Sequence, residues 1–586
     1  MDYILHVAIF ILIYAIIVQS LNLIIGYVGI ISMAHAIFAA IGAYSAALIS
    51  VHLGLNFVVG FIVGFIISAI IGALVALPSL RVRDEYLIVF TVGFQMVLYE
   101  FMLTARGITQ GQGGIGGIES PVIFGVSIDS TLSYLVFTIV VATICFLLCW
   151  RLVNSPFGRV LKAIREDEAA CRALGKNTLL FKVSVFAIGG GLAAIGGSLF
   201  AHYVTFISPF SFTIEASIFL IVMVVIGGSA NFWGPLVGAG ILIGLPELLN
   251  FIPGAAGAID AIREMLFGLV LMACMLFRPQ GILPEYSRNR LMIVSEPANR
   301  EEGRQPDEES IQRESFLKED SNPVTSKGIE SEDRPILELK NVTKTFGGLK
   351  AVDDASIVLT EGKIIGLIGP NGCGKTTLFN LVTGFIEPDR GSIYLRGEDV
   401  TKVSPYKLVD KGLVRSWQDT KIFKGMTVLE NVMVGFTKQP GEQLHNLYAT
   451  YKQVKEEEAN NRIVALDYLK KVELLDKKDL LAGDLSVAEQ KLVALARLLA
   501  TGCPILLLDE PTASLDLDSV NRIIKIIRDI AKAANKTVLL IEHNLDVVRG
   551  IVEKAYFMSE GKIIAYDAPL ELMKNKKLSE VYFGIE

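Results

Sequence analysis

A glycine-rich segment in the second half of the chain has the residue types and spacing of a phosphate-binding loop. Residues 363–368 (KIIGLI) are rich in β-branched side chains, as in a buried parallel strand, and the G-x-x-x-x-G-K-T segment 369–376 follows directly. Its glycines let backbone N–H groups converge on phosphate oxygens, and the helix expected next directs the positive end of its dipole there. The spacing therefore predicts ATP binding. The residues expected to contact the nucleotide are Gly369, Asn371, Gly372, Cys373, Gly374, Lys375, Thr376 and Thr377.

Four side chains could carry out the chemistry on that nucleotide. Lys375 can reach the β- and γ-phosphates, and the Thr376 hydroxyl is placed to coordinate Mg²⁺. A second apolar strand is expected at 505–508, and Asp509 and Glu510 follow it. Asp509 is suited to hold Mg²⁺ through water and Glu510 to polarise the attacking water, because phosphoryl transfer needs positioning and charge more than covalent chemistry. An acidic pair can also be an ordinary strand end, but together with the loop it predicts ATP hydrolysis.

The elements that position these residues belong to a chain of unusual composition. Of its 586 residues, 52% are hydrophobic and 19% charged, whereas soluble proteins carry about 25% charged residues. No Asp, Glu, Lys or Arg occurs between Tyr3 and Leu80, so the first half suits lipid and the second suits water. The net charge of −6 argues against nucleic-acid binding, which needs a basic face. The six cysteines lack a regular spacing and are expected to be small buried hydrophobic residues.

Apolar segments long enough to cross a bilayer recur through the first half of the chain. The loop 151–182 is rich in Lys and Arg and is expected in the cytoplasm, which places the Gly-rich stretch 107–119 and the N-terminus outside. The segment 214–230 is either a full or a broken crossing. The sequence predicts about nine spans of ~20 residues each. They fall at about 3–25, 31–50, 56–79, 86–105, 132–150, 182–203, 214–230, 234–252 and 262–277.

Small and polar residues within these spans carry further information. In the segment 31–50, Ala36 and Ala40 are four residues apart with Gly42 nearby, a spacing that lets helix backbones approach closely in lipid. His35 is either a functional group at membrane depth or a histidine that hydrogen-bonds a neighbouring helix. The same two interpretations apply to Ser32, Tyr44, Glu100, Glu215 and Glu247.

Five segments of the first half resemble the permease subunits of branched-chain amino-acid ABC importers. These segments are 22–49, 80–94, 155–175, 224–234 and 246–249. Members of that family usually carry one more N-terminal hydrophobic segment than this chain. With one crossing fewer, the N-terminus is expected outside the membrane, which agrees with the sidedness inferred from charge. The resemblance also implies that Glu168, Ala169, Ala170 and Gly175 belong to a loop that docks on an ATPase. A solvated amphipathic loop is the alternative.

The segment 286–335 joins the two halves. It has little apolar content and a dense mixture of both charges, so it cannot form a core. We interpret it as a flexible tether that leaves the ATPase free to dock on its own permease or on a neighbouring one. A regulatory element is the alternative. The predicted domains are therefore a transmembrane permease domain at 1–285, a disordered linker at 286–335 and a nucleotide-binding domain at 336–586.

The second half, about 336–586, is similar to the ABC ATPases, which implies an α/β fold. The similarity assigns roles to residues that match the family's motifs. It implies that Phe346 stacks on adenine, that Gln418 joins the Mg²⁺ site to the permease contact and that Glu510 is the catalytic base. By the same similarity Asp516 crosses a dimer interface and His543 contacts the γ-phosphate. The segments GGLKAVDDAS, GLVRSWQDTKIFKGMTVLENVMVG and VYFGIE resemble the branched-chain amino-acid subtype.

One family motif is altered. The family signature reads L-S-x-G-Q and contacts the nucleotide held by a partner subunit, but here Ala488 replaces the glycine and Glu489 the glutamine, after Ser486. Ala488 adds a Cβ where backbone meets ligand, and Glu489 adds a negative charge near an anion. One hypothesis is that the ATP site using this signature is weakened, while this chain's own loop is completed by a partner's intact signature. The alternative is that Gln490 and a small shift compensate.

The resemblance implies an ATP-driven importer of small polar solutes, most simply branched-chain or other amino acids. Its cofactors are ATP and Mg²⁺. A complete transporter would need a second permease and a second ATPase, as a homodimer or a related heteromer, and an extracytoplasmic substrate-binding protein. The expected place is the cell membrane, crossed several times, with the ATPase in the cytoplasm. An importer of urea or short amides, an ABC exporter half-transporter and an ATP-gated membrane protein that does not pump are the alternatives.

Overall fold

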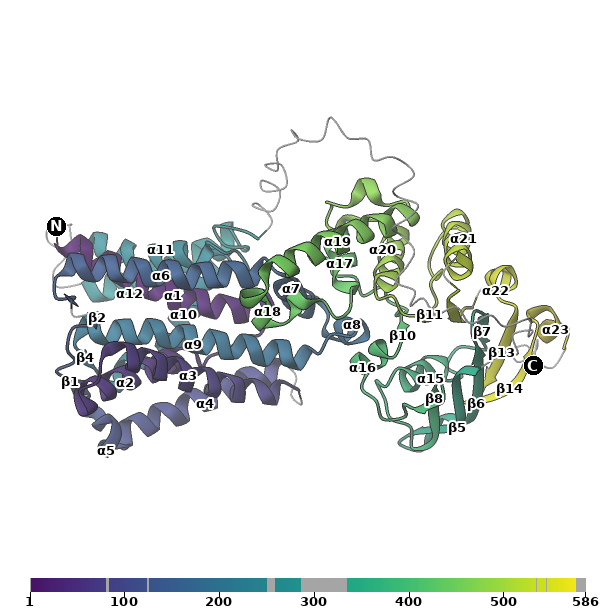
Figure 1. The fold of residues 1–586 in the computed structure, drawn as a ribbon, viewed down its shortest axis with the longest axis horizontal. Coiled ribbons are helices and arrows are strands. Elements are labelled where there is room, and N and C mark those ends of the chain that lie inside the picture. The colour runs from purple at the N-terminus through teal and green to yellow at the C-terminus, as the bar shows by residue number, and fades with distance from the viewer. Residues whose placement is uncertain are drawn as a thin grey trace, which may run out of the picture.

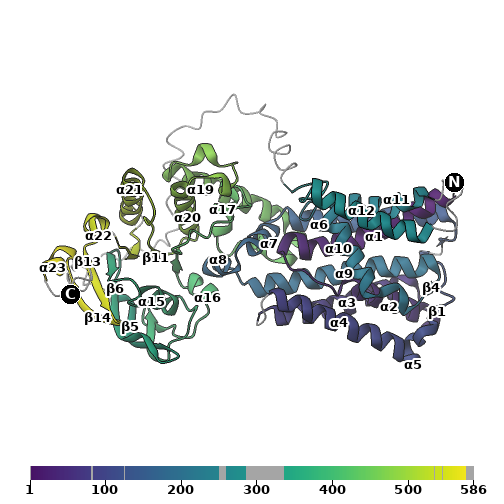
Figure 2. The same ribbon diagram turned by 180° about the vertical axis from the view of Figure 1, so that it is seen from behind.

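The computed structural model describes residues 2–80, 84–123, 126–249, 259–285, 335–533, 535–543 and 545–575. A bundle of long helices forms one end of the molecule and an α/β domain forms the other (Figures 1 and 2). The predicted linker lies almost entirely outside the described residues, as does the terminal VYFGIE segment. Their interpretation therefore remains a prediction.

In the described part of the membrane domain, nine helices coincide with the nine predicted spans. Seven are long and apolar enough to cross a membrane, while α11 and α12 have shorter apolar stretches. The segment 214–230 forms one helix, α10, that ends at Gly227, and the candidate span that contains it runs from Pro209 to Gly227. The nine helices are α1 (Asp2–Asn22, extended by a π-helical turn Leu23–Val28), α2 (His35–Leu53), α3 (Phe57–Ala76), α4 (Asp84–Thr104), α6 (Thr131–Val153), α9 (Thr178–Val204), α10 (Ile214–Gly227), α11 (Gly234–Leu249) and α12 (Ile259–Phe277).

Helices α2, α3 and α9 pack closely through small residues. A Cβ added at Gly42 of α2 would lie 2.0 Å from the carbonyl oxygen of Ala194 on α9. One added at Gly72 of α3 would lie 2.4 Å from the carbonyl oxygen of Phe186, also on α9. The close packing predicted for the segment 31–50 is confirmed, because only a hydrogen fits between these backbones.

Other predictions for single side chains are resolved by the packing. His35 is fully buried, and its Nε2 lies 2.7 Å from the Ser20 hydroxyl of α1, so it hydrogen-bonds a neighbouring helix. Five of the six cysteines are buried, and all six are free thiols, as expected for small apolar residues.

The basic loop 151–182 folds into two short helices at the end of the bundle that faces the α/β domain. Helix α7 (Pro156–Glu166) begins with proline in its first turn, and the Ser155 side chain accepts the backbone N–H of Gly158. Helix α8 (Glu168–Ala173) follows at once, capped by Asp167, whose Oδ1 accepts the N–H of Ala170 at 2.7 Å. These caps fix the sharp turn between the two helices.

The α/β domain contains two sheets within the described residues. The larger has the strand order β10-β11-β12-β7-β13-β14, in which all neighbours pair in parallel except β13 and β14. The two predicted strands are confirmed as β7 (Ile364–Ile368) and β11 (Ile505–Asp509), both fully buried. The other strands of this sheet are β10 (Leu413–Arg415), β12 (Thr537–Ile541), β13 (Lys554–Ser559) and β14 (Lys562–Asp567).

An antiparallel sheet and a set of helices complete this domain. The sheet has the order β6-β5-β8-β9, formed by β5 (Pro335–Phe346), β6 (Leu349–Thr360), β8 (Arg390–Leu395) and β9 (Glu398–Asp399). The helices near the membrane domain are α16 (Pro405–Asp410), α17 (Val428–Gly435), α18 (Leu444–Ala449), α19 (Tyr451–Lys471) and α20 (Val487–Ala500). Helices α15 (Lys375–Val382), α21 (Leu517–Ala533), α22 (Leu545–Ile551) and α23 (Pro569–Lys574) lie beyond them.

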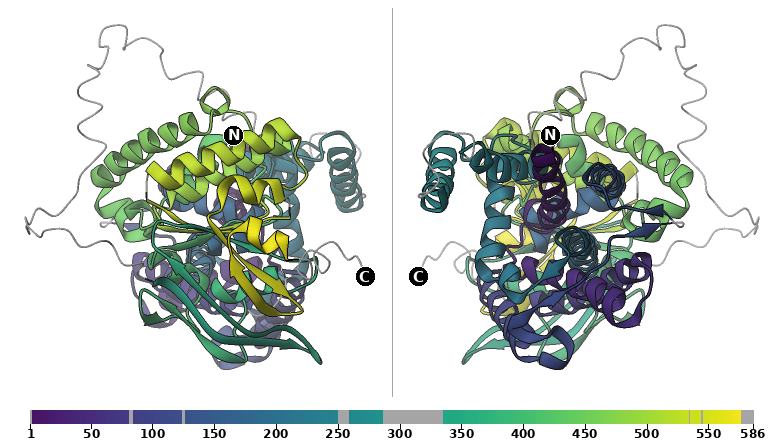
Figure 3. Two further views of the ribbon diagram at one scale, coloured as in Figure 1. Left: turned by 90° about the vertical axis from the view of Figure 1, so that its right-hand side faces the viewer. Right: turned by 90° about the vertical axis from the view of Figure 1, so that its left-hand side faces the viewer.

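The two domains are joined end to end. Helices α7 and α8 lie between the bundle and the ATP-binding half, and the N-terminus lies at the opposite end of the bundle (Figure 1). Viewed along the molecule, the long helices of the bundle run roughly parallel to one another (Figure 3). The predicted sidedness, with the loop 151–182 inside and the N-terminus outside, requires this arrangement.

Candidate functional site

Glycines shape the loop between β7 and α15. Gly369 has φ +152° and Gly374 has φ +109°. A Cβ at these positions would lie 2.0 Å from the carbonyl oxygen of Met558 and 2.1 Å from that of Ala351, respectively. Gly372 has φ +77° with open space beside it. The loop therefore needs glycine at two positions for close backbone contact and at the third for its conformation.

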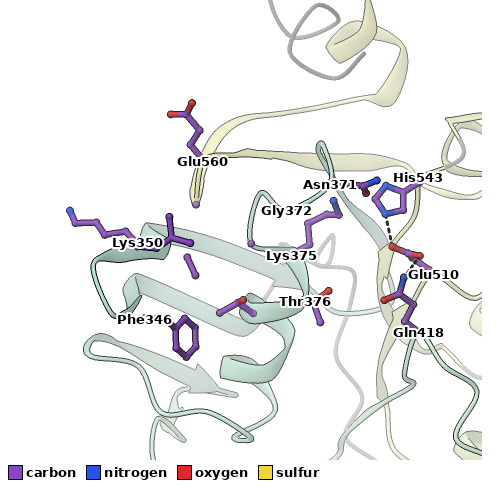
Figure 4. A pocket seen from close by; sticks show the side chains of 15 residues that line it. Phe346, Lys350, Asn371, Gly372, Lys375, Thr376, Gln418, Glu510, His543 and Glu560 are labelled. Carbon is purple, nitrogen blue, oxygen red and sulfur yellow. Dashed lines mark hydrogen bonds and ion pairs between the residues drawn. The ribbon is translucent and has the colours of Figure 1, made fainter. Parts of the chain in front are cut away.

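The loop borders an open cavity of about 960 Å³ (Figure 4). Lys375 Nζ donates to the carbonyl oxygens of Gly369 and Pro370, at 2.8 Å each. These are bonds that an incoming phosphate can replace. The cavity brings together ten of the predicted residues, namely Phe346, Asn371, Gly372, Gly374, Lys375, Thr376, Thr377, Gln418, Glu510 and His543.

Glu510 lies at the centre of a three-residue cluster on one wall of the cavity. Its Oε1 is 2.5 Å from His543 Nε2, and its Oε2 accepts a hydrogen bond from Gln418 Nε2 at 2.8 Å. Glu510 follows β11, His543 follows β12 and Gln418 follows β10, and the three side chains converge in Figure 4. Glu510 has φ +47°, a conformation that costs free energy in a residue with a Cβ and that the surrounding contacts must hold in place.

The residues predicted to bind Mg²⁺ fit that ion. Asp509 Oδ1 is buried and has no hydrogen-bond partner in the described part of the chain, while Oδ2 accepts from Arg415 Nη2 at 3.2 Å. Burial raises the pKa of Asp509 to about 6, and the Arg415 guanidinium opposes this rise. Thr376 and Gln418 supply hydroxyl and amide oxygens from the cavity wall. Mg²⁺ prefers oxygen ligands, and a buried carboxylate oxygen without a partner is suited to it.

Six of the predicted residues do not line the cavity: Asp509, described above, and five others. Gly369 and Cys373 are part of the loop's packed side, and Cys373 is 5% exposed. Ser486 begins α20, where its hydroxyl donates to Glu489 Oε2 at 2.9 Å. Ala488 lies in the same first turn, and Asp516 Oδ2 accepts the backbone N–H of Ser519 at 3.1 Å.

Sequence reasoning missed five residues that line the cavity, namely Leu349, Lys350, Ala351, Glu560 and Gly561, and also Arg415, which pairs with Asp509. Lys350 and Glu560 line the cavity, from the start of β6 and from the turn between β13 and β14. Gly561, which follows Glu560 and has φ +81°, signals a tight turn but not what the turn approaches. Arg415 was missed because an arginine at the end of a strand gives no indication of a buried partner.

The segment after Gln418 connects this cluster to the membrane domain. Lys421 Nζ lies 3.0 Å from Asp167 Oδ2, the residue that caps α8. The backbone N–H of Gly425 donates to Glu166 Oε2 at 3.3 Å. One short stretch of chain therefore contacts the cluster around Glu510 at one end and the loop 151–182 at the other.

More contacts hold α7 and α8 on the α/β domain. Lys176, which is 1% exposed, donates to the carbonyl oxygen of Phe436 and to Glu442 Oε1, at 2.5 Å each. Arg159 forms an ion pair with Glu458 of α19. These contacts confirm the prediction that the loop 151–182 docks on the ATPase, and they exclude a loop that is merely solvated.

Comparison with known proteins agrees with both halves. Residues 3–276 match the family model described as "Branched-chain amino acid transport system / permease component", and residues 352–513 match the ABC transporter model. The chain is 37% identical over 255 residues to a probable branched-chain amino acid transport ATP-binding protein LivG of Methanocaldococcus jannaschii. The aligned residues cover 42% of this chain and 97% of the relative. The chain belongs to the branched-chain amino-acid transport family of ABC transporters.

Further relatives of this ABC transporter match the same half. It is 34% identical over 252 residues to the high-affinity branched-chain amino acid transport ATP-binding protein BraF of Pseudomonas aeruginosa, covering 43% of this chain and 98% of the relative. The crystal structure of an ATP-binding cassette of an ABC transporter in its ADP conformation matches with 35% identity and a TM-score of 0.38, covering 43% of this chain and 99% of the other.

The family membership defines the general activity. The ABC transporter is a multi-pass membrane protein that binds ATP and couples its hydrolysis to transport. Members of this family work with further transporter subunits and a substrate-binding protein. The exporter, channel and urea alternatives are not favoured by these matches.

Proposed function

We propose that the chain imports branched-chain amino acids across the cell membrane, with the ATPase domain in the cytoplasm. The observation that carries this proposal is the continuous connection from Glu510, through Gln418 and Lys421, to Asp167 of the membrane domain. The names of the relatives supply the substrate class. In this proposal the domains have the predicted limits, 1–285 for the permease, 286–335 for the linker and 336–586 for the ATPase.

In this proposal each side chain has a catalytic role that its position supports. Lys375 exchanges its loop carbonyls for the β- and γ-phosphates, and Phe346, 48% exposed at the cavity edge, stacks on adenine. Glu510 polarises the attacking water, while His543 holds the carboxylate in place and contacts the γ-phosphate. Bound Mg²⁺ supplies charge neutralisation of the phosphates, and Thr376, Gln418 and Asp509 would hold it.

Gln418 can report nucleotide binding to the membrane domain. Its amide group donates to Glu510 in this structure. Gln418 would be one of the residues that hold Mg²⁺ with the bound nucleotide, and exchanging its hydrogen bond to Glu510 for that role would move the segment 418–421. Because Lys421 is paired with Asp167, this motion pulls on α8 and, through it, on the helices of the bundle.

A second ATPase completes the machine in this proposal. Ser486, Ala488 and Asp516 lie away from the chain's own cavity, the placement expected of residues that act on the nucleotide of a partner subunit. A second permease and an extracytoplasmic binding protein are the remaining partners. With Ala488 and Glu489 in place of the family's glycine and glutamine, the partner is a related subunit with an intact signature, and the two ATP sites are unequal.

The proposal is tested by reconstitution. The full chain, the subunits that co-purify with it and a candidate binding protein are placed in liposomes, and uptake of labelled leucine is measured with ATP inside the compartment facing the ATPase. We expect uptake that requires ATP, and loss of uptake in Glu510→Gln. Glu571→Gln, an exposed change on α23, is the matched control. ATP-dependent uptake of urea but not of leucine would contradict the substrate class.

A further inference from the structure

A second cavity lies in the membrane domain, between the first half of α1 and helices α10 and α11. Its volume is about 480 Å³, within the range of about 300–1,000 Å³ typical of small-molecule sites. It borders the start of α1, and the N-terminus lies at the end of the bundle farthest from the ATPase domain (Figure 1). With the predicted sidedness, this is the side on which an imported substrate arrives.

Aromatic rings form much of the wall. Tyr3, His6, Phe10 and Tyr14 follow one another at intervals of three or four residues along one face of α1, and Phe219 of α10 lies opposite. His6 packs edge-on against Phe10 with ring centres 4.9 Å apart, and Tyr14 packs edge-on against Phe219 at 6.5 Å. Aromatic faces carry partial negative charge and attract cations, in particular ammonium groups.

A single carboxylate belongs to the same wall. Glu247 of α11 lines the cavity next to Pro246 and accepts a hydrogen bond from the Tyr3 hydroxyl. A carboxylate offers about four lone-pair sites on its two oxygens, so a hydroxyl and the ammonium group of a ligand can share it. Ionisable residues among the apolar helices of membrane proteins commonly mark substrate paths.

The rest of the cavity distinguishes the two ends of a ligand. Val7, Leu242 and Ile243 supply aliphatic surface. His6 Nδ1 lies 2.6 Å from the Tyr203 hydroxyl. The second ring nitrogen, Nε2, can donate a hydrogen bond to a carboxylate when it carries a proton. The walls therefore offer a partner for an ammonium group, a donor for a carboxylate and an apolar surface for a short branched chain.

We propose that this cavity is an outer-side binding site for a small aliphatic amino acid, held by its ammonium group at Glu247 and the surrounding aromatic rings. The proposal rests on the proposed import function and gives it a site within the permease. A lipid acyl chain would also fit the apolar part, but it has no use for the carboxylate. The carboxylate with its aromatic surroundings therefore favours an amino acid.

The test compares three ligands of nearly the same shape. L-leucine, 3-methylbutylammonium, which lacks the carboxylate, and 4-methylpentanoate, which lacks the ammonium group, compete for labelled leucine on the purified full chain in nanodiscs. We expect leucine and 3-methylbutylammonium to bind. We expect 4-methylpentanoate to bind at least about tenfold more weakly, because it loses the charge-assisted hydrogen bond to Glu247.

Substitutions locate the ligand. Glu247→Gln is expected to weaken both ammonium compounds at least about tenfold, and Glu247→Asp, which keeps the charge, to restore part of the affinity. Phe10→Leu keeps the bulk but removes a ring face, and it decides the matter independently if Glu247→Gln does not fold. Glu119→Gln is the matched control, because that side chain is exposed and does not line the cavity.

The outcomes separate this inference from the proposed function. Equal binding by all three ligands, no effect of Glu247→Gln, or a co-purified phospholipid that leucine does not displace would overturn the site. If reconstituted liposomes take up leucine with the same KM in Glu247→Gln, the site is wrong and the import function stands. If no leucine is taken up but Glu247-dependent binding of ammonium compounds persists, the site stands and the function is wrong.

Discussion

Lys421 of the ATPase domain and Asp167 of the membrane domain form an ion pair, with 3.0 Å between Nζ and Oδ2. Lys421 is three residues beyond Gln418, which bonds Glu510. The backbone carbonyl oxygen of Lys421 also accepts a hydrogen bond at 3.0 Å from the side chain of Arg497, a buried residue of helix α20. The same short segment therefore links the Glu510 carboxylate, helix α20 and the loop that docks on the ATPase domain.

The first prediction concerns this ion pair. Lys421→Gln and Asp167→Asn are each expected to reduce the stimulation of ATPase activity by the binding protein about 1.4- to fivefold, since partly exposed pairs contribute about 0.2–1 kcal/mol. The unstimulated rate should not change, because an asparagine side chain can still cap α8. A double-mutant cycle on the stimulated rate measures the coupling. Lys438→Gln, which breaks an exposed pair with Asp410, is the control. Strictly additive effects would show that the pair transmits nothing.

The second prediction concerns Glu510. Glu510→Gln is expected to lower ATP turnover of the assembled complex about 10²–10⁴-fold, the usual range for a general base. ATP binding should persist, because Lys375 and its loop are unchanged. The equivalent change in a partner ATPase should cost less, since that site uses the altered signature of this chain. Turnover and nucleotide binding are measured for both variants, and equal losses would contradict unequal sites.

The third prediction concerns the signature itself. Replacing Ala488 by Gly and Glu489 by Gln in one variant is expected to raise ATP turnover. The change removes a Cβ and a negative charge near the partner's nucleotide. The fold should tolerate it, because glutamine can also close the capping box that Glu489 now forms with Ser486. A turnover equal to that of the unmodified complex would indicate that the native signature is already competent.

The fourth prediction concerns helix packing in the bundle. Gly42→Ala is expected to destabilise the membrane domain by about 1–3 kcal/mol, because its Cβ meets the Ala194 backbone and forces α2 and α9 apart. Gly93→Ala in α4 is the matched control, since no atom lies within 4 Å of the added Cβ. Thermal unfolding in detergent compares the two. Similar midpoints would show that the two helices separate without cost.

The fifth prediction is a pH dependence of α8. Partial burial raises the pKa of Glu168, but the hydrogen bond and charge of Lys182, together with the Thr178 hydroxyl, outweigh burial and hold this pKa below its usual value of 4.5. The carboxylate therefore stabilises the fold above pH 4.5, and this contribution is lost as the pH falls through the lowered pKa.

Hydrogen exchange of residues 167–178, followed as the pH falls from above 4.5 to well below it, measures this effect, because the contribution of the carboxylate is lost on the acid side of that value. Protection in the native chain should fall at the acid end. In the Glu168→Gln variant, protection corrected for the intrinsic exchange rate should be lower than in the native chain above pH 4.5. It should also be nearly independent of pH. A native chain whose protection does not change across this range would contradict the assignment.

The elements of this protein could be predicted because their signals are local. Each membrane helix follows from a continuous apolar run, and β7 and β11 follow from short β-branched or aliphatic runs that end in polar motifs. The glycines of the loop 369–376 predicted close backbone contact without indicating that Met558 and Ala351 would be the neighbours. Family motifs placed Gln418 and His543 in the site, although nothing in their own surroundings distinguishes them.

By itself the sequence determined which segments enter lipid, where the phosphate loop lies and which acidic residues follow a buried strand. The tertiary structure alone decided that Glu510 contacts His543 and Gln418, that Arg415 pairs with the buried Asp509, and that Lys421 pairs with Asp167. Hydropathy and backbone propensity are properties of neighbouring residues. Pairing between charges far apart in the chain, and the burial that raises the pKa of Asp509, depend on how the folded chain brings remote segments together.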